Sequence, residues 1–422
     1  MTHRFCWIPL YLMACAVRAA EPFLPLAEYE VRSNRAAIDR ALSEARDAMN
    51  DDGMDQEQRI LVRQFMAALG NELRLLDTLP PRDLPIATVA HGAETARYPS
   101  VGALLHDRET ICSGTLVAPR AFVTARHCFH YSEKPGDFAV FLQHAGFYRI
   151  EEVIFPENPD VDVALLELRE DVTGVRASAL ARTKTPAPAR RQIAGFGVTE
   201  TNARDSGIKR QGSVITRTCG HSPDIYICWD FNLPYQQQQS QSNVCSRDSG
   251  GPVGQAVDEH MATEDGVSIR ISPNLDCHRQ SESWSQAIHA LFAWLTTKVA
   301  AVPSGITGGD SIPECCGEGV TVWARDGVLR AGRNAVHRLD DTTEVRLVRV
   351  SLNATDVPSL DLSLKIYVNR QLQDARNCSD YGRYISCEFR YPSPVPMGSW
   401  AVRVTHEAGG TGRYQLVLTM FE

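Results

Sequence analysis

The amino-acid sequence predicts a mainly β protein built from several domains. Between residues 89 and 301 short apolar strands alternate with turn residues, and residues 314–422 carry a second series of such strands. Residues 27–77 differ, because their apolar side chains recur at helical spacing. A chain of 422 residues is long enough for two or three domains.

Bulk composition excludes one broad class of function. The formal net charge is −8, so the chain lacks the basic footprint of a nucleic-acid-binding protein. No nucleic-acid partner is therefore expected.

Residues 1–20 have the pattern of a signal peptide. Arg4 precedes an apolar stretch at residues 5–17, and Ala19 and Ala20 supply the small residues of a cleavage site. The stretch is too short to cross a membrane. A second interpretation is a bacterial lipobox that ends in a lipid-bearing Cys15. Both interpretations predict export, to a secreted, periplasmic or cell-surface location.

Residues 21–88 are predicted to form a helical hairpin and a linker. Two amphipathic segments flank a turn at residues 50–53, and residues 79–85 contain three prolines. We expect a pro-segment that inhibits the following domain or assists its folding. The alternative is a stable hairpin that binds a partner.

Two short motifs supply the parts of an activated nucleophile. Ser249 lies in Cys-Ser-Arg-Asp-Ser-Gly-Gly-Pro at residues 245–252, and His127 lies in Thr-Ala-Arg-His-Cys at residues 124–128. A serine hydroxyl is a poor nucleophile at neutral pH. It needs a base within hydrogen-bond distance and a third group that orients the base.

The candidate for the third group is Asp162, which opens the apolar segment at residues 162–168. Asp160 and Glu167 are nearby acids, but the flanking valines favour Asp162 as the carboxylate of an apolar strand. The order histidine, aspartate, serine is that of the chymotrypsin class. Together the three motifs resemble those of trypsin-like serine proteases.

The resemblance covers residues 89–301, about half of the chain, and implies a fold. We expect two six-stranded β-barrels, with His127 and Asp162 on the first and Ser249 on the second. A C-terminal helix at residues 283–299 is expected to close the domain.

The same resemblance implies an oxyanion hole made by the backbone amides of Ser249 and Arg247. The family normally has glycine at position 247, where the turn requires an unusual backbone conformation. Arginine keeps the amide, so the hole can still form. Its long side chain is expected to project near the leaving-group side.

The specificity pocket departs from the tryptic pattern. Asn243 stands where tryptic enzymes have aspartate, and a buried substrate cation facing a neutral amide is left unpaired, which is costly. Val244, Ser268 and Arg270 are expected to complete the pocket. We therefore expect cleavage after a neutral or apolar residue rather than after lysine or arginine. Arg270 in the pocket wall adds the alternative of an acidic preference.

Activation is expected to require cleavage. In the family a freed amino terminus pairs with the aspartate before the nucleophile, here Asp248. Val89 fits best as that terminus, after cleavage behind Thr88, and Ile86 is the alternative. Neither follows a basic residue, so a non-tryptic activating protease is expected.

Export makes disulfides the expected use of cysteine. The family resemblance implies three bridges in the protease region, and a fourth is expected in the C-terminal domain: Cys112–Cys128, Cys219–Cys228, Cys245–Cys277 and Cys378–Cys387. Cys315 and Cys316 form a vicinal bridge or pair elsewhere. A zinc site is the competing use of cysteine, but paired C-x-x-C spacings are lacking. We expect neither metal nor cofactor.

Residues 302–313 are rich in glycine, proline and serine and form a predicted linker. Residues 314–422 then predict an all-β sandwich. Several short segments there resemble the bacterial pre-peptidase C-terminal domain: residues 361–368, 398–400 and 412–414 and the pair Cys378 and Cys387. That resemblance implies attachment to a cell surface, secretion or substrate binding. The alternative is an inert stabilising module.

Two functions follow from these patterns. The first is a secreted serine endopeptidase, made as a zymogen, that acts on protein or peptide substrates through an acyl-enzyme. The second is a catalytically silent, protease-like binding protein. An intact set of three catalytic side chains favours the first.

Overall fold

The computed structural model describes residues 92–422 together with Met66 and Val89. It omits residues 130–133, 201–202, 221, 232–241, 273–276, 278–280, 303–318, 331, 341–343, 356–360, 369–370, 374–376, 397–398 and 409–410. The predicted signal peptide, lipobox and helical hairpin lie outside the described residues. So do Cys315, Cys316 and nearly all of the predicted linker.

The first domain begins with a closed six-stranded antiparallel barrel. Its strands run in the order β2-β3-β4-β7-β6-β5. Alternating apolar residues from all of them fill the interior, with Leu104, Phe122 and Leu166 fully buried. The bounds are β2 Val101–His106, β3 Glu109–Ala118, β4 Ala121–Thr124, β5 Phe138–Leu142, β6 Gly146–Ile154 and β7 Ala164–Leu168.

A second six-stranded barrel follows, and the pairing of β9 with β10 closes its ring. Ile193, Trp229 and Val253 are among its buried core residues. Two short strands add to the outside, because β1 pairs with β10 and β8 pairs with β13. The bounds are β1 Ala93–Glu94, β8 Ala179–Leu180, β9 Arg190–Gly195, β10 Arg210–Arg217, β11 Tyr226–Phe231, β12 Pro252–Val257, β13 His260–Ser272 and β14 Ser281–Ala287.

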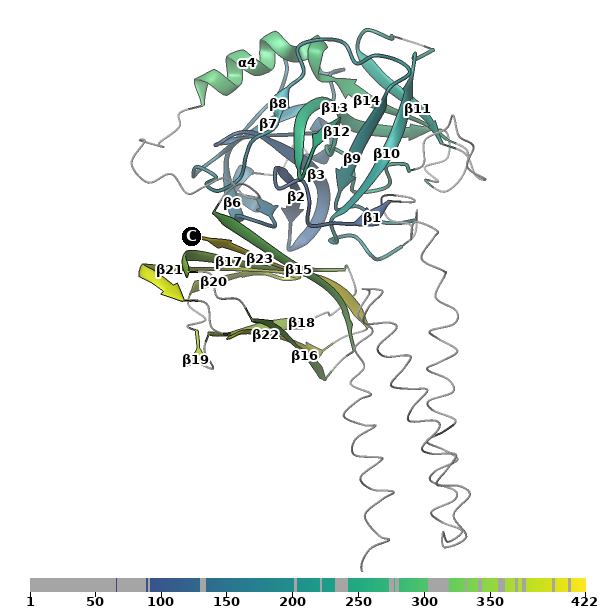
Figure 1. Cartoon of the computed structure of the whole chain (residues 1–422). Coiled ribbons are helices and arrows are strands. Elements are labelled where there is room, and N and C mark those ends of the chain that lie inside the picture. The colour runs from purple at the N-terminus through teal and green to yellow at the C-terminus, as the bar shows by residue number, and fades with distance from the viewer. Residues whose placement is uncertain are drawn as a thin grey trace, which may run out of the picture.

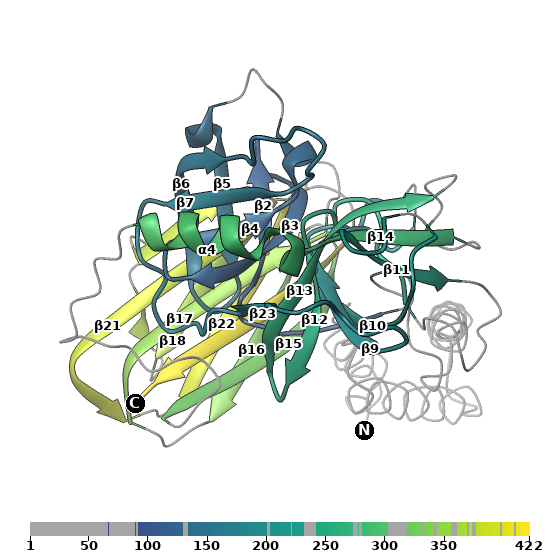
Figure 2. The same ribbon diagram turned by 90° about the horizontal axis from the view of Figure 1, so that it is seen from above.

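The expected C-terminal helix is shorter than the sequence pattern suggests. The strand β14 ends at Ala287, a 3₁₀ turn follows at Ile288–Leu291, and helix α4 spans Phe292–Ala301. The expected start at residue 283 is therefore wrong, because Ser283 to Gln286 complete the sheet by pairing with β11. Leu295 is buried in the core of the first barrel, so α4 lies across that barrel (Figure 2).

After residue 318 the chain forms two further antiparallel sheets, with orders β15-β23-β17-β21-β20 and β16-β22-β18-β19. One apolar cluster contains residues of both, including Val350, Trp400 and Leu418, so the sheets pack as a sandwich. The bounds are β15 Val320–Leu329, β16 Arg333–Asp340, β17 Glu344–Ala354, β18 Asp361–Val368, β19 Gln371–Leu372, β20 Cys378–Tyr381, β21 Tyr384–Pro396, β22 Ser399–Ala408 and β23 Gly412–Phe421.

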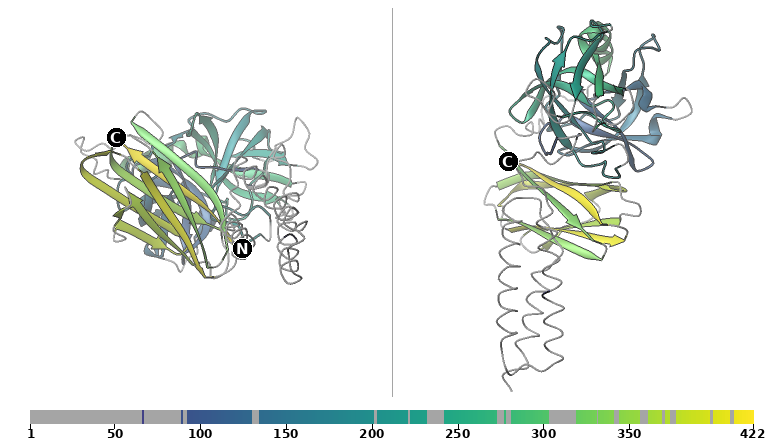
Figure 3. Two further views of the ribbon diagram at one scale, coloured as in Figure 1. Left: turned by 60° about the horizontal axis from the view of Figure 1, so that its bottom comes forward. Right: turned by 90° about the vertical axis from the view of Figure 1, so that its right-hand side faces the viewer.

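The five-stranded sheet of the sandwich faces the first domain, and the four-stranded sheet lies on the far side (Figures 1 and 3). The junction contains buried polar contacts. Gln143 donates to Asn353 and Gln415, each over 3.0 Å, and His144 lies 2.9 Å from the hydroxyl of Thr419. In the part of the chain that the structure describes, no helix is long and apolar enough to cross a membrane.

Candidate active site

The structure brings His127 and Asp162 together. His127 lies in a short 3₁₀ turn directly after β4, and Asp162 lies in the loop that enters β7. Because β4 and β7 are paired, the residues at their neighbouring ends meet. One carboxylate oxygen of Asp162 accepts the backbone amide of His127 at 2.9 Å, and the other lies 2.7 Å from Nδ1 of the ring.

This contact selects the tautomer of the ring. Burial raises the pKa of Asp162, but the hydrogen bonds and charge of His127 outweigh it, and the net shift is downward. An ionised carboxylate only accepts hydrogen bonds, so Nδ1 of His127 carries the proton. In the neutral ring Nε2 then keeps its lone pair, as a general base requires.

The two alternative acids have other surroundings. Glu167 forms an ion pair with Arg120 at 2.9 Å, and Asp160 is exposed. Neither contacts His127 in the described part of the chain.

Ser249 lies in the turn before β12, on the second barrel, and this turn packs against the chain that leads to His127. A Cβ at Gly250 would lie 2.8 Å from the amide nitrogen of Ala125 and closer still to the hydroxyl of Thr124. Gly250 also has a φ of +85°, so position 250 suits only glycine. Ser113 donates its backbone amide to the carbonyl of Ser249 at 2.9 Å. Among the described residues, the Ser249 hydroxyl makes no hydrogen bond with His127.

Arg247 adopts the backbone conformation that the family gives to glycine, with a φ of +72°. This left-handed conformation costs a non-glycine residue roughly 1–3 kcal/mol, so other contacts must stabilise it. Ser113 Oγ donates to the carbonyl of Arg247 at 3.0 Å. The guanidinium donates to Ser206 Oγ at 2.5 Å and lies 3.9 Å from the carboxylate of Glu109. The motif alone gave no signal for these last two residues.

Asp248 is buried beneath the turn. Its carboxylate accepts the amides of Gly197 at 2.8 Å and Cys245 at 2.9 Å. Burial raises its pKa to about 7, although those two hydrogen bonds and the charge of Arg210 act in the opposite direction. Arg210 is itself fully buried and donates to the carbonyl of Gly197 at 2.7 Å.

Val89 is buried in the core of the second barrel. Its side chain is 1% exposed and belongs to the apolar cluster of the second barrel that contains Val198, Val244 and Cys245. Cys245 of this cluster donates its backbone amide to Asp248, so Val89 belongs to the same apolar core as a residue that binds this carboxylate.

Asn243 is fully buried and lies six residues before Ser249. Its Oδ1 accepts from Nε1 of Trp229 at 3.0 Å and from the hydroxyl of Ser283 at 2.6 Å. An indole nitrogen only donates, so this contact identifies the oxygen of the amide. Ser268 is buried in β13, opposite Ser285. Arg270 lies in the same strand, but its side chain is outside the described residues.

The structure forms four disulfides between the expected partners: Cys112–Cys128, Cys219–Cys228, Cys245–Cys277 and Cys378–Cys387. The first lies beside His127, and the third ties the nucleophile segment to the chain after β13. Sulfur atoms of Cys112 and Cys128 and a nitrogen of His127 lie within 4.8 Å of one another. Because the two sulfurs are bonded to each other, they offer no thiolate to a metal.

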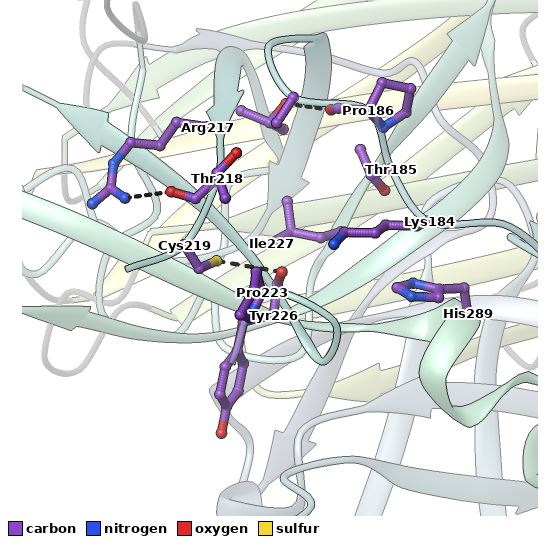
Figure 4. Close-up of a pocket in the computed structure, with 12 residues that line it drawn as sticks. Lys184, Thr185, Pro186, Arg217, Thr218, Cys219, Pro223, Tyr226, Ile227 and His289 are labelled. Atoms are coloured by element: carbon purple, nitrogen blue, oxygen red, sulfur yellow. Dashed lines mark hydrogen bonds between the residues drawn. The ribbon is translucent and has the colours of Figure 1, made fainter. Parts of the chain in front are cut away.

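A cavity of about 320 Å³ lies elsewhere on the second barrel (Figure 4). Lys184, Thr185, Arg217 and His289 are among the residues that line it. None of the expected catalytic or pocket residues does so. Lys184 is paired with Asp224 at 2.8 Å, and Arg217 with Asp230 at 2.7 Å. We assign no function to this cavity.

A histidine bound to a carboxylate, beside a serine turn at the junction of two β-barrels, has the layout of a serine hydrolase site. Residues 89–261 match the family model described as Trypsin. The chain therefore contains a trypsin-like serine protease domain.

Two solved structures are among those to which the chain is similar. Human heparin binding protein is 18% identical, with a TM-score of 0.41, over 51% of this chain and 99% of its own. Neuropsin, a serine protease expressed in the limbic system of mouse brain, is 19% identical, with a TM-score of 0.40, over 49% and 98%. No curated protein matches the chain.

Proposed function

We propose that residues 89–301 form a secreted serine endopeptidase in which Ser249, His127 and Asp162 act together. The observation that carries this proposal is the double contact between Asp162 and His127, next to a nucleophile turn packed on Ala125. The match of residues 89–261 to the Trypsin family supports the reaction class.

In the proposed mechanism, Nε2 of His127 takes the proton of Ser249 as the hydroxyl oxygen attacks the peptide carbonyl. The backbone amides of Arg247 and Ser249 stabilise the negative charge on the carbonyl oxygen. His127 then gives its proton to the leaving amine, and water releases the acyl group by the same route. The lack of a hydrogen bond between Ser249 and His127 is compatible with this role, because such contacts often tighten only when substrate binds.

We also propose a non-tryptic specificity. The oxygen of Asn243 accepts from Trp229 and Ser283, and an amide carries no charge, so position 243 has no carboxylate to pair with a substrate cation. A lysine or arginine side chain would meet a neutral amide instead of a carboxylate. A neutral residue before the scissile bond suits this environment better.

Activation by cleavage after Thr88 is part of the proposal. The buried position of Val89 supports it, and so does the start of the Trypsin match at residue 89. A new amino group there would supply the positive charge that the buried Asp248 needs to ionise. For the β-sandwich, attachment to a cell surface remains a proposal, and the four disulfides favour an oxidising compartment outside the cytoplasm.

The test is covalent labelling by a fluorophosphonate probe, which reacts with an activated serine. Protein whose amino terminus is Val89 should be labelled at Ser249, and Ser249→Ala and His127→Ala should prevent labelling. A protein that starts at Val89, is folded and does not react would instead be a silent, protease-like binding protein.

A further inference from the structure

Two contacts of the Arg247 side chain lead to the C-terminal sandwich. Arg247 has a positive φ without being glycine, and its guanidinium is held by Ser206 at 2.5 Å and by Glu109 at 3.9 Å. Both Ser206 and Glu109 belong to the protease domain. In each case, however, the next residue along the chain contacts the sandwich.

The first connection runs through the loop before β10. Ser206 is 1% exposed, and the carbonyl of the following Gly207 accepts from Nδ2 of Asn353 in β17 at 2.7 Å. A Cβ at Gly207 would overlap the carbonyl oxygen of Ala354, also in β17. The loop that presents Ser206 to Arg247 is therefore seated directly on the five-stranded sheet.

The second connection runs through the start of β3. Arg383, in the turn before β21, lies 3.7 Å from the carboxylate of Glu109, which thus stands between Arg383 and Arg247. The adjacent Thr110 is buried, and its hydroxyl is hydrogen-bonded to the hydroxyl of Tyr384. The sandwich therefore contacts both the side chain of Glu109, through Arg383, and the neighbouring Thr110, through Tyr384.

We propose that the C-terminal sandwich positions the oxyanion-hole turn through Arg247. The proposal deepens the proposed function and rests on it. In place of the conformational freedom of glycine, this chain uses an arginine anchored by residues that the sandwich supports. Asn353, Arg383 and Tyr384 are positioning residues, and none of them is proposed to touch the substrate.

The test is a set of variants in protein that starts at Val89. Removing two sandwich contacts at once, by Arg383→Met with Tyr384→Phe, should lower kcat about tenfold with little change in KM, because only the transition state uses the oxyanion hole. Arg383→Lys, which keeps the cation, should retain most of the activity. The matched control is Thr419→Val, which removes an interdomain hydrogen bond to His144 that does not lead to Arg247.

The same substitutions are then made in an Arg247→Gly background. Glycine takes a positive φ without a side-chain anchor, so the sandwich substitutions should now change kcat less than about twofold. An equal loss of kcat in both backgrounds would overturn the proposal, and so would full kcat in a folded double variant. If the double variant does not fold, Arg383→Met alone serves, because this side chain is partly exposed.

Amide hydrogen exchange separates this proposal from the proposed function. Exchange in the peptide covering residues 245–251 should quicken in Arg383→Met with Tyr384→Phe and stay unchanged in Thr419→Val. This readout needs no catalysis. A failure to label Ser249 with quickened exchange would reject the peptidase alone, whereas normal labelling with unchanged exchange would reject the positioning role alone.

Discussion

Asp162 contacts His127 through both of its carboxylate oxygens, one on the backbone amide and one on the ring. The side chain therefore fixes both the position of the turn and the tautomer of the imidazole. An amide at position 162 would keep the size of the side chain but could place an N–H group against the ring.

Asp162→Asn should consequently lower kcat by about 10³–10⁴-fold and leave the fold intact. The measurement is the hydrolysis rate of a short peptide ester, together with the circular dichroism spectrum. Asp160→Asn, two residues away and exposed, is the control and should stay near the rate of the unmodified enzyme. Comparable rates for both variants would remove Asp162 from the triad.

Gly250→Ala should disrupt the packing of the nucleophile turn against the segment that carries His127. The added methyl group would overlap Thr124 and Ala125, and the φ of +85° would become strained. We expect a loss of roughly 2–4 kcal/mol in the free energy of unfolding, and a loss of activity in whatever folds. Denaturant unfolding measures the loss in free energy. Gly136→Ala is the control, since a Cβ there meets no atom within 4 Å.

Asn243→Asp should shift the specificity towards lysine and arginine. Trp229 and Ser283 would still donate to the new carboxylate, which places a negative charge at this position for a substrate cation. The ratio of kcat/KM for an arginine peptide to that for a neutral one should rise about tenfold or more. Peptide libraries that vary only the residue before the scissile bond measure this ratio. An unchanged preference would show that position 243 does not face the substrate.

The uncleaved precursor should lose stability from Asp248 as the pH rises. The pKa of Asp248 is about 7 in the folded chain and 3.8 in its ordinary state, so between these values the folded chain binds more protons than the unfolded chain. The contribution of Asp248 to the free energy of unfolding is fully present below pH 3.8. It declines as the pH rises to 7, by about 4 kcal/mol at most. Asp248→Asn should lack this decline, apart from a pH-independent offset for one lost hydrogen bond.

The measurement is the unfolding free energy of uncleaved Ser249→Ala protein, with and without Asp248→Asn, between pH 4 and pH 8. His144 has the opposite effect on the unfolding free energy, which it makes rise with pH. Burial lowers the pKa of His144 to about 3, helped by the charge of Lys209. His144 is present in both proteins, so its effect cancels in the difference between their unfolding free energies. Parallel pH curves would contradict the prediction for Asp248.

The barrels and the three catalytic candidates could be predicted because their signals are local. His127, Asp162 and Ser249 each lie in a short run of characteristic residues, and strand periodicity marks most of the sheets. Strands β15 and β16 lacked that signal, since Arg325, Asp326 and Gly327 interrupt the first of them. The start of helix α4 was expected too early because Trp284, which lies in β14, is at helical spacing from Ile288 and Leu291.

The junction with the sandwich could not be predicted for another reason. Gln143 meets Asn353 and Gln415, which lie 210 and 272 residues further along the chain, and these polar residues carry no pattern that pairs them. The positive φ of Arg247 was expected from the resemblance, but its partners come from two separate segments, Ser206 from the loop before β10 and Glu109 from the start of β3. Such contacts depend on the assembled tertiary structure and not on any one segment.

The short strand β1 bears on the kinetics of activation. It starts at Ala93, four residues after Val89, and is fixed by its pairing with β10 and by the ion pair of Glu94 with Arg413. An amino terminus created at Val89 would thus be joined to a fixed strand by only a few residues. The effective concentration of its binding site would therefore be high. Once the bond after Thr88 is cut, ordering of the active site should be a fast first-order step. Its rate should not depend on protein concentration, and the whole time course should reflect the cutting protease alone.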